Sequence, residues 1–369
     1  MTSVAPVRWT PRALAQACVQ QPLTRPVPAD DGPFRARKGL WKLAVRTGRR
    51  QLLLGLSGQL PLLRMRIAPA WRRLLWVHEG MPQIGDALMD LAPRSLLHER
   101  GLSVDLFAAP HVASLFAGDR WFARVLSSDG DVQAQDYDAV IVLSHDRKAL
   151  RLKRERLPAL PWVSLQGYYG GPDFHRARFA ARRVADLLGL TLSDAELAPH
   201  ATQKLAVDDA ASRWAAQHAL ARRTVAVALG GVRAERTYHR WVEVARLLRQ
   251  RGVEQLLLLG GHNGRPLADQ LAAADGRPPM LDLVGRTDLR QAHALLSRAS
   301  VAVCADGGLM HLAFAASIPV VSIFSAAIEP QWRLPPHASG ASLASSTAAV
   351  DDLSPHAIAD AVCTVLRAH

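Results

Sequence analysis

The chain has 369 residues, 49% of them hydrophobic, which is long enough for two globular domains and excludes a chain that is disordered throughout. Its formal net charge is +13, and residues 1–74 carry most of it, with 14 Lys and Arg against Asp30 and Asp31. A basic segment joined to a nearly neutral body points to an anionic partner, which could be a phospholipid surface, a phosphorylated glycolipid or nucleic acid.

Cysteine usage and hydropathy indicate the compartment. Cys18, Cys304 and Cys363 are too few and too widely spaced for a disulfide framework or a zinc site, which favours a reducing environment. We expect no secretory signal, because the first residues lack a basic start followed by an apolar core. Residues 52–63 are apolar but are interrupted by glycine and proline, and they fall short of the roughly 20 residues of a spanning helix. We therefore expect a cytoplasmic protein.

Residues 1–73 form a predicted basic extension. Up to about Asp31 the chain is rich in proline and polar residues, which predicts a loose arm. From Phe34 to Leu75, Arg and Lys are interleaved with Trp and Leu, a pattern that suits short amphipathic helices lying on a lipid surface or on a partner. Alternatively, these helices pack on the body of the protein and point their arginines into water. The sequence favours neither alternative.

From Leu74 onward, short apolar β-rich runs alternate with helical patterns, which is typical of βαβ units and a parallel sheet. They divide into two Rossmann-like domains, residues 74–205 and 206–369, with a linker over 190–205 and an amphipathic helix over 208–221. Two such domains that face each other bind ligands in a cleft at the carboxyl ends of their strands. The predicted strands are Leu74–His78, Val104–Ala108, Ala139–Leu143, Trp162–Leu165, Thr224–Leu229, Gln255–Leu259, Val301–Cys304 and Pro319–Phe324.

The first candidate catalytic residue follows the first strand. In the stretch IGDALMD, which begins at Ile84, Gly85 and Asp86 occupy the turn where a helix starts. The positive end of a helix favours an ionised carboxylate, which is the form that a general base needs. The alternative is that Asp86 only caps the helix, which is a common use of aspartate.

The most specific stretch is CADGGLMH, which begins at Cys304 and joins a buried strand to a helix. Glycines at such a turn let the backbone approach a ligand, and free amides at a helix start suit a diphosphate. Asp306 can accept hydrogen bonds from sugar hydroxyls, and His311 can donate one to a phosphate; alternatively, His311 is a helix histidine with structural partners. The candidate binding residues of this stretch are Asp306, Gly307, Gly308, Leu309 and His311.

Two further turns carry candidate donor-binding residues. In VAVALGGVRAER, a strand leads to Gly230 and Gly231, and then to Arg233 and Arg236. A guanidinium there can neutralise the charge that develops on a departing nucleotide diphosphate, although a solvated loop is the alternative for each arginine. In LVGRTDLRQ, a strand from Leu283 precedes a turn and a helix capped near Asp288, so that Thr287 borders a nucleotide pocket.

These stretches, in this order and separation, resemble glycosyltransferase family 9, the heptosyltransferases that use ADP-heptose. The resemblance covers about residues 74–335. It implies a GT-B fold and an inverting, metal-independent transfer of heptose from ADP-heptose to an anionic glycolipid such as the lipopolysaccharide inner core. It also implies that Asp86 is the base and that residues 306–311 hold the heptose and the diphosphate. The nucleotide sugar is then a substrate, and no cofactor is expected.

The sequence departs from the family pattern at three places. The family's usual Lys before a Trp-Pro pair is missing from the ERTY stretch at 235–238, so an arginine takes its place. Gly307 stands where Ser or Thr is frequent, and residues 262–264 read His-Asn-Gly where a ribose-binding Glu is frequent. The D-x-D pair at Asp129 and Asp131 predicts a turn after a hairpin rather than a metal site.

Three other functions are compatible with parts of the pattern. The basic extension and the altered donor loop also suit a catalytically weak, membrane-associated scaffold of glycan assembly. A transferase that uses another nucleotide sugar or a protein acceptor is a second alternative. Nucleic-acid binding ranks last, because aromatic residues are sparse in the extension and no recognised module is present. If the extension binds lipid, the protein is peripheral on the inner face of the inner membrane.

Overall fold

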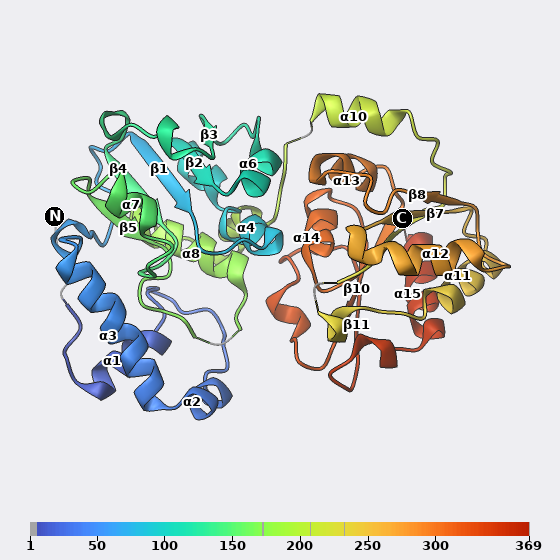
Figure 1. Ribbon diagram of the computed structural model, residues 1–369, viewed down its shortest axis with the longest axis horizontal. Coiled ribbons are helices and arrows are strands. Elements are labelled where there is room, and N and C mark those ends of the chain that lie inside the picture. Colours follow the sequence, from blue (N-terminus) through green and yellow to red (C-terminus); the bar gives the residue numbers. More distant parts are fainter. Residues whose placement is uncertain (1–5, 172, 207, 232, 369) are drawn as a thin grey trace. The chain divides into compact units, whose positions relative to one another are not determined.

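A computed structural model shows an α/β protein that divides into two compact units, Met1–Thr202 and Gln203–His369 (Figure 1). Each unit contains one parallel sheet, which confirms the predicted pair of Rossmann-like folds. The first five residues of the predicted extension lie outside the part that the structure describes. The described residues are 6–171, 173–206, 208–231 and 233–368.

The N-terminal unit is built around β1 (Arg73–His78), with β2 (Ser103–Ala108) on one side and β4 (Ala139–Val142) on the other. The sheet order is β3-β2-β1-β4-β5, and every pair is parallel. All of β1 except Arg73 is buried, as expected for a strand covered on both faces. The other elements are α1 (Pro11–Val19), α2 (Gly32–Lys38), α3 (Leu40–Leu56), η1 (Leu60–Leu62), α4 (Ile84–Asp90), α5 (Arg94–Glu99), α6 (Pro110–Phe116), β3 (Val125–Leu126), η2 (Asp129–Asp131), η3 (Ala134–Asp136), α7 (Arg151–Glu155), β5 (Trp162–Ser164), α8 (Arg176–Leu188), α9 (Asp194–Leu197) and η4 (Ala198–Ala201).

The C-terminal unit has the sheet order β11-β10-β9-β6-β7-β8, again parallel throughout. Its four central strands are short apolar runs that are largely buried, as expected for strands covered on both faces. The elements are α10 (Asp209–Ala216), β6 (Thr224–Ala228), η5 (Ala234–Arg236), α11 (Trp241–Gln250), β7 (Gln255–Leu259), η6 (His262–Gly264), α12 (Arg265–Ala273), β8 (Met280–Asp282), α13 (Leu289–Leu296), β9 (Val301–Ala305), α14 (Gly308–Ala315), β10 (Val320–Phe324), η7 (Pro330–Trp332), β11 (Gly340–Ala344), η8 (Val350–Asp352) and α15 (Pro355–Ala368).

The predicted loose arm is wrong for the described residues before Asp31. They contain α1, which begins with Pro11 after a Thr10 side chain that caps the amide of Ala13. One face of α1 packs against α3, and both belong to the group of helices at one side of the N-terminal unit (Figure 1). The signal was present in the sequence as an N-cap followed by apolar residues at helical spacing. The buried residues of α1 are Leu14, Ala15, Cys18 and Val19.

Four other expectations need correction. The predicted linker over 190–205 contains α9, whose Ser193–Glu196 capping box starts a helix that is followed by η4. No hairpin precedes the D-x-D pair, because β2 and β3 are parallel. The strand expected from Leu283 lies earlier in the chain. It is β8, which ends at Asp282, and the turn begins at Val284. The helix expected over 208–221 ends at Ala216.

The short strands β3 and β11 were not predicted, and β8 was expected to begin only at Leu283. Each lies on an outer part of its sheet and is half-buried or exposed, so its sequence lacks a marked apolar run. Partner strands rather than local propensity hold such segments extended.

Candidate active site

Asp86 lies in the first turn of α4, which follows β1. The N-cap position belongs to Gln83, whose side chain makes no capping bond, so the interpretation of Asp86 as an N-cap is wrong. Oδ1 of Asp86 instead forms an ion pair with Nη1 of Arg176 at 3.1 Å. This ion pair holds the Asp86 carboxylate in place. Its partner lies 90 residues further along the chain.

Arg176 connects Asp86 to a buried network. It is the first residue of α8, which packs on α4, and it binds Asp90 through two hydrogen bonds of 2.6 and 2.7 Å. Asp86 and Asp90 are four residues apart and therefore share one face of α4. Nε2 of His78, at the end of β1, lies 3.2 Å from Oδ2 of Asp90. The order of contacts is therefore Asp86, Arg176, Asp90 and His78.

Electrostatics explain why the pair of Asp90 and Arg176 is held in its charged form. Burial by itself raises the pKa of Asp90, but the Arg176 charge and the His78 hydrogen bond bring it below its ordinary value. Burial likewise opposes the charge of Arg176, yet Asp90 and Asp86 raise the pKa of that guanidinium. Arg176 and Asp90 were missed by the sequence analysis, since nothing local links residues so far apart.

A cavity of about 640 Å³ lies at the carboxyl ends of β1, β4 and β5. The residues that directly follow these strands line it, including Glu79, Ser144 and Gln166. Arg176 also lines it, and therefore the residue that holds Asp86 contacts this space. In parallel α/β sheets, ligands bind at this edge.

In the C-terminal unit, Asp306 lies in the turn between β9 and α14 and is 7% exposed. Its Oδ2 is 3.0 Å from Nη1 of Arg236, and its Oδ1 is 3.6 Å from Nε of Arg333. The two predicted stretches that contain Asp306 and Arg236 are thus brought together. Arg333 was missed, because it follows the short helix η7 in a segment without the strand and glycine-turn pattern that marked the other candidates.

Arg233 and Arg236 have different surroundings, although they are three residues apart. The Arg233 side chain is 66% exposed and lies 3.7 Å from Glu235, whereas the Arg236 side chain is 28% exposed and reaches Asp306. Arg233 therefore lies in a solvated loop, which was the alternative interpretation of its sequence. Of the two, Arg236 is the arginine that contacts the turn between β9 and α14.

The predicted glycine turns bring three loops into close contact. Gly230 has φ +82°, and a Cβ there would lie 2.8 Å from the amide nitrogen of Gly264. A Cβ on Gly231 would lie 2.7 Å from Oγ1 of Thr237, and one on Gly285 would lie 2.8 Å from Nδ1 of His262. At Gly230 a side chain would meet backbone, so glycine is required there, and the loops after β6, β7 and β8 pack together at these glycines.

The remaining predicted residues lie in α14 or just before α13. His311 is 3% exposed, and its Nδ1 lies 3.2 Å from Oε1 of Gln203, which gives it a structural partner. Gly308 and Leu309 lie in the first turn of α14, where backbone amides have no acceptor within the helix. Thr287 is half-buried and precedes the Asp288 capping box of α13, as predicted for that helix start.

Asp129 and Asp131 form η2, a turn capped by Ser128. Asp129 accepts two hydrogen bonds from Arg151, at 2.6 and 2.9 Å, and these lower its pKa. Its carboxylate is therefore engaged within the protein.

Comparisons with known proteins show what the chain resembles. Residues 174–352 match glycosyltransferase family 9 (heptosyltransferase), whereas no curated protein matches the chain. The fold is similar to that of a glycosyl transferase family 9 protein from Veillonella parvula DSM 2008, with a TM-score of 0.67 and 14% identity over 82% of this chain and 100% of that one.

Two Escherichia coli structures also share the fold. One is ADP-heptose lps heptosyltransferase II, with a TM-score of 0.60 and 17% identity over 80% of this chain and 99% of that one. The other is heptosyltransferase WaaC with ADP-2-deoxy-2-fluoro heptose, with a TM-score of 0.58 and 17% identity over 78% of this chain and 98% of that one. The chain therefore has the GT-B fold of these heptosyltransferase structures, and the part of it that resembles glycosyltransferase family 9 includes Arg236 and Asp306.

Proposed function

We propose that the chain transfers heptose from ADP-heptose to a hydroxyl group of an anionic glycolipid such as the lipopolysaccharide inner core. The observation that carries this proposal is the buried Asp306 carboxylate, which lies between Arg236 and Arg333 at the start of α14. The two guanidiniums and the helix amides suit a diphosphate, and the carboxylate suits sugar hydroxyls. The similar WaaC structure contains an ADP-heptose analogue, which supports this choice of donor.

The reaction is a single displacement with inversion, and no metal ion takes part. The acceptor oxygen attacks the anomeric carbon of heptose while the bond from that carbon to the phosphate oxygen breaks. ADP leaves with the bonding electrons, and Asp86 takes the proton of the acceptor hydroxyl. Arg236 and Arg333 stabilise the charge that develops on the leaving diphosphate. Attack opposite the leaving group inverts the anomeric carbon.

Arg176 gives Asp86 the fixed orientation that this role requires. A general base must lie within hydrogen-bond reach of the proton that it removes. The ion pair with Arg176 holds the carboxylate, and the bonds from Arg176 to Asp90 hold the guanidinium in turn. Arg176 is therefore a positioning residue, and Asp86 is the proposed catalytic one.

The test is the Asp86→Asn variant, which keeps the side chain's shape and removes its basicity. We expect the transfer rate to fall by roughly 10²- to 10⁴-fold, while ADP binding and the circular dichroism spectrum stay unchanged. Asp129→Asn is the matched control, because Asp129 is also held by an arginine but lies in a surface turn. Transfer by Asp86→Asn at close to the wild-type rate rules out Asp86 as the base.

We further propose that the extension holds the protein on an anionic lipid surface. In the described part of the chain, the large apolar side chains that are exposed all lie between Trp9 and Met65. On α3, Trp41 is 68% exposed and Leu56 is 81% exposed. Each residue of a helix is rotated by about 100° from the one before it, so Trp41 and Leu56 lie on the same side of α3 as Leu52. The cationic side chains of Lys42 and Arg49 lie next to them.

This pattern suits a helix that lies in the plane of a membrane, with apolar side chains among the acyl chains and cations at the headgroups. None of the described helices combines the length and the apolar character needed to cross a bilayer. We expect sedimentation with phosphatidylglycerol vesicles and little with phosphatidylcholine vesicles. The double variant Trp41→Ser, Leu56→Ser should weaken that binding at least about tenfold, since each side chain contributes on the order of 1.5 kcal/mol or more when buried. Unchanged binding by this variant contradicts the proposal.

A further inference from the structure

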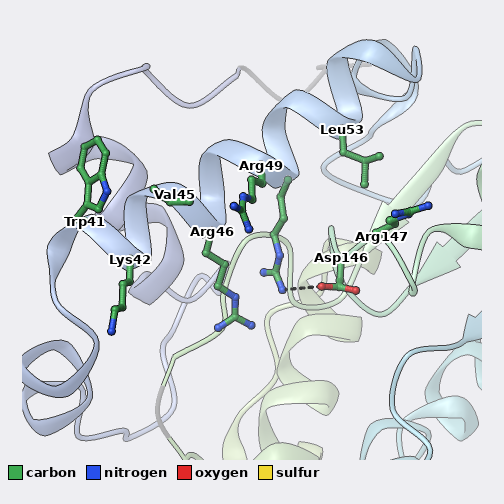
Figure 2. Close-up of a pocket in the computed structure, with 9 residues that line it drawn as sticks. Trp41, Lys42, Val45, Arg46, Arg49, Leu53, Asp146 and Arg147 are labelled. Atoms are coloured by element: carbon green, nitrogen blue, oxygen red, sulfur yellow. Dashed lines mark hydrogen bonds and ion pairs between the residues drawn. The ribbon is translucent and has the colours of Figure 1, made fainter.

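Helix α3 forms one wall of a second cavity, of about 740 Å³, which adjoins the cavity at the carboxyl ends of the strands. Arg46, Arg50 and Asp146 line both cavities. Figure 2 shows Lys42 and Arg46 extending from α3 on the side that faces the loop with Asp146 and Arg147. A helix of the extension therefore continues the space that begins at the sheet edge.

The lining of this cavity is strongly cationic. Its charged side chains are Lys42, Arg46, Arg49, Arg50, Arg147 and Asp146. The single carboxylate, Asp146, already lies 3.5 Å from Nη2 of Arg50, and its other oxygen accepts a hydrogen bond from the amide of Lys148. The cations are thus in clear excess over the anionic groups that line the space with them.

Two of these arginines are tied to backbone carbonyl oxygens; Arg50 is buried, whereas Arg46 is exposed. The Arg50 side chain is 9% exposed and donates a hydrogen bond of 3.0 Å to the carbonyl oxygen of Tyr168. Arg46 donates one of 3.2 Å to the carbonyl oxygen of Gly170. Gly170 also makes room for Arg46, because a Cβ there would lie 2.7 Å from the Arg46 guanidinium carbon.

The positive charges of Arg46 and Arg50 repel each other. Burial lowers the pKa of Arg50, and the nearby charge of Arg46 lowers it further. Like charges destabilise a fold unless an anion compensates them, and Asp146 offsets only one of the two. The fixed fork of a guanidinium binds phosphate through two parallel hydrogen bonds. An anionic ligand would therefore relieve the repulsion that this arrangement creates.

We propose that Arg46 and Arg50 of the extension form a binding site for a phosphate group on the acceptor's saccharide. This inference rests on the proposed function, since it assigns the phosphate to the acceptor rather than to the donor. The donor residues are predicted in the C-terminal unit, whereas this site continues the cavity that Arg176 lines, and Arg176 holds Asp86. A phosphate bound by α3 would place the rest of the saccharide along the carboxyl ends of β1, β4 and β5.

The experiment compares two deacylated core saccharides, one phosphorylated and one treated with phosphatase, by calorimetry with the full chain and without donor. We expect the wild type to bind the phosphorylated saccharide more tightly. Arg46→Gln should weaken that binding roughly tenfold to hundredfold, because a hydrogen bond to a charged group is lost. It should leave binding of the phosphatase-treated saccharide unchanged. Arg12→Gln on α1 is the matched control, since it removes the same charge from an exposed position that lines neither cavity.

A second variant separates position from charge. Gly170→Ala keeps every charge but forces the Arg46 guanidinium to move, which is inexpensive for the fold because only the end of a flexible side chain shifts. We expect weaker binding of the phosphorylated saccharide with a melting temperature close to that of the wild type. Equal affinity of the wild type for the two saccharides, or equal losses in Arg46→Gln and Arg12→Gln, overturns the inference.

The same measurements distinguish this inference from the membrane proposal and from the transferase assignment. If phosphatidylglycerol vesicles bind and Arg46→Gln weakens only that binding, the arginines serve a lipid headgroup and the inference is wrong. Calorimetry with ADP reports on the C-terminal unit independently. Normal ADP binding and heptose transfer with no preference for the phosphorylated saccharide would sink this site alone, whereas phosphate-dependent binding without any transfer would sink the proposed function.

Discussion

The candidate sites of the two units use the same pair of residue types in opposite proportions. In the N-terminal unit, one guanidinium, Arg176, lies between two carboxylates, Asp86 and Asp90. In the C-terminal unit, one carboxylate, Asp306, lies between two guanidiniums, Arg236 and Arg333. A site with more carboxylates than guanidiniums is suited to accepting a proton. A site with more guanidiniums than carboxylates is suited to binding a diphosphate. The ratio of charges therefore indicates the task of each site better than any single residue does.

The largest expected effect comes from breaking the N-terminal cluster. Arg176→Met leaves Asp90 buried without its cation, and we expect a loss of about 3 to 5 kcal/mol in the free energy of unfolding, as for other broken buried ion pairs. Urea denaturation followed by circular dichroism measures this change. Arg178→Met on the same helix is the control and should cost less than about 1 kcal/mol. Similar losses in the two variants would mean that the cluster is not a special source of stability.

The pH dependence of the same variant sharpens the comparison. In the wild type the pKa of Asp90 is below its ordinary value, so its contribution is present above the unfolded value of about 3.9 and is lost as the pH falls through the folded value. Without Arg176, burial raises the pKa of Asp90, and protonation then stabilises the variant. The deficit of Arg176→Met relative to the wild type should therefore shrink between pH 7 and pH 5. A deficit that is constant or grows over this range contradicts the assignment.

In the C-terminal cluster, Arg236→Ala should weaken ADP binding roughly tenfold to hundredfold, because it removes a charged donor from the proposed diphosphate site. Arg233→Ala removes the same charge three residues earlier from a side chain that is 66% exposed, and we expect a change of less than about threefold. Isothermal titration calorimetry measures both. Equal effects would show that net charge, and not the contact with Asp306, governs binding.

Arg333 is the weaker member of that cluster, since its Nε lies 3.6 Å from Asp306. Arg333→Gln should weaken ADP binding roughly two- to fivefold, which is less than the effect of Arg236→Ala. The same titrations provide the ranking, and the reverse order would mean that Arg333 is the main phosphate ligand.

The smallest effect is expected at Gly307. This residue is extended, and a Cβ there would meet only the carbonyl oxygen of Ala305 at an ordinary 3.7 Å. Gly307→Ser should change the free energy of unfolding by less than about 0.5 kcal/mol and should not weaken ADP binding. By contrast, a Cβ on Gly264 would lie 2.7 Å from the carbonyl oxygen of Leu229, so Gly264→Ala should cost about 1 to 3 kcal/mol. Thermal denaturation distinguishes the two.

The sequence predicted the central elements of both sheets because these strands are buried on both faces and read as apolar runs. It also predicted the turns at Gly230 and Gly307, because glycine beside a strand end is a local signal. The outer strands β3 and β11 were missed and β8 was misplaced, since these strands lack such runs and depend on their neighbours. The same limit explains α1, whose burial depends on α3 although its cap was readable.

By itself, the sequence determined which residues can carry chemistry: Asp86, Asp306 and the arginines of the donor loop. Only the tertiary structure decided how they are partnered. Arg176 and Asp86 are 90 residues apart, and Arg236 and Asp306 are 70 apart, so no local pattern could pair them. The reason is physical: periodicity and turn chemistry act over a few residues, whereas the pairing of charges follows from which helices and loops the packed sheets bring together.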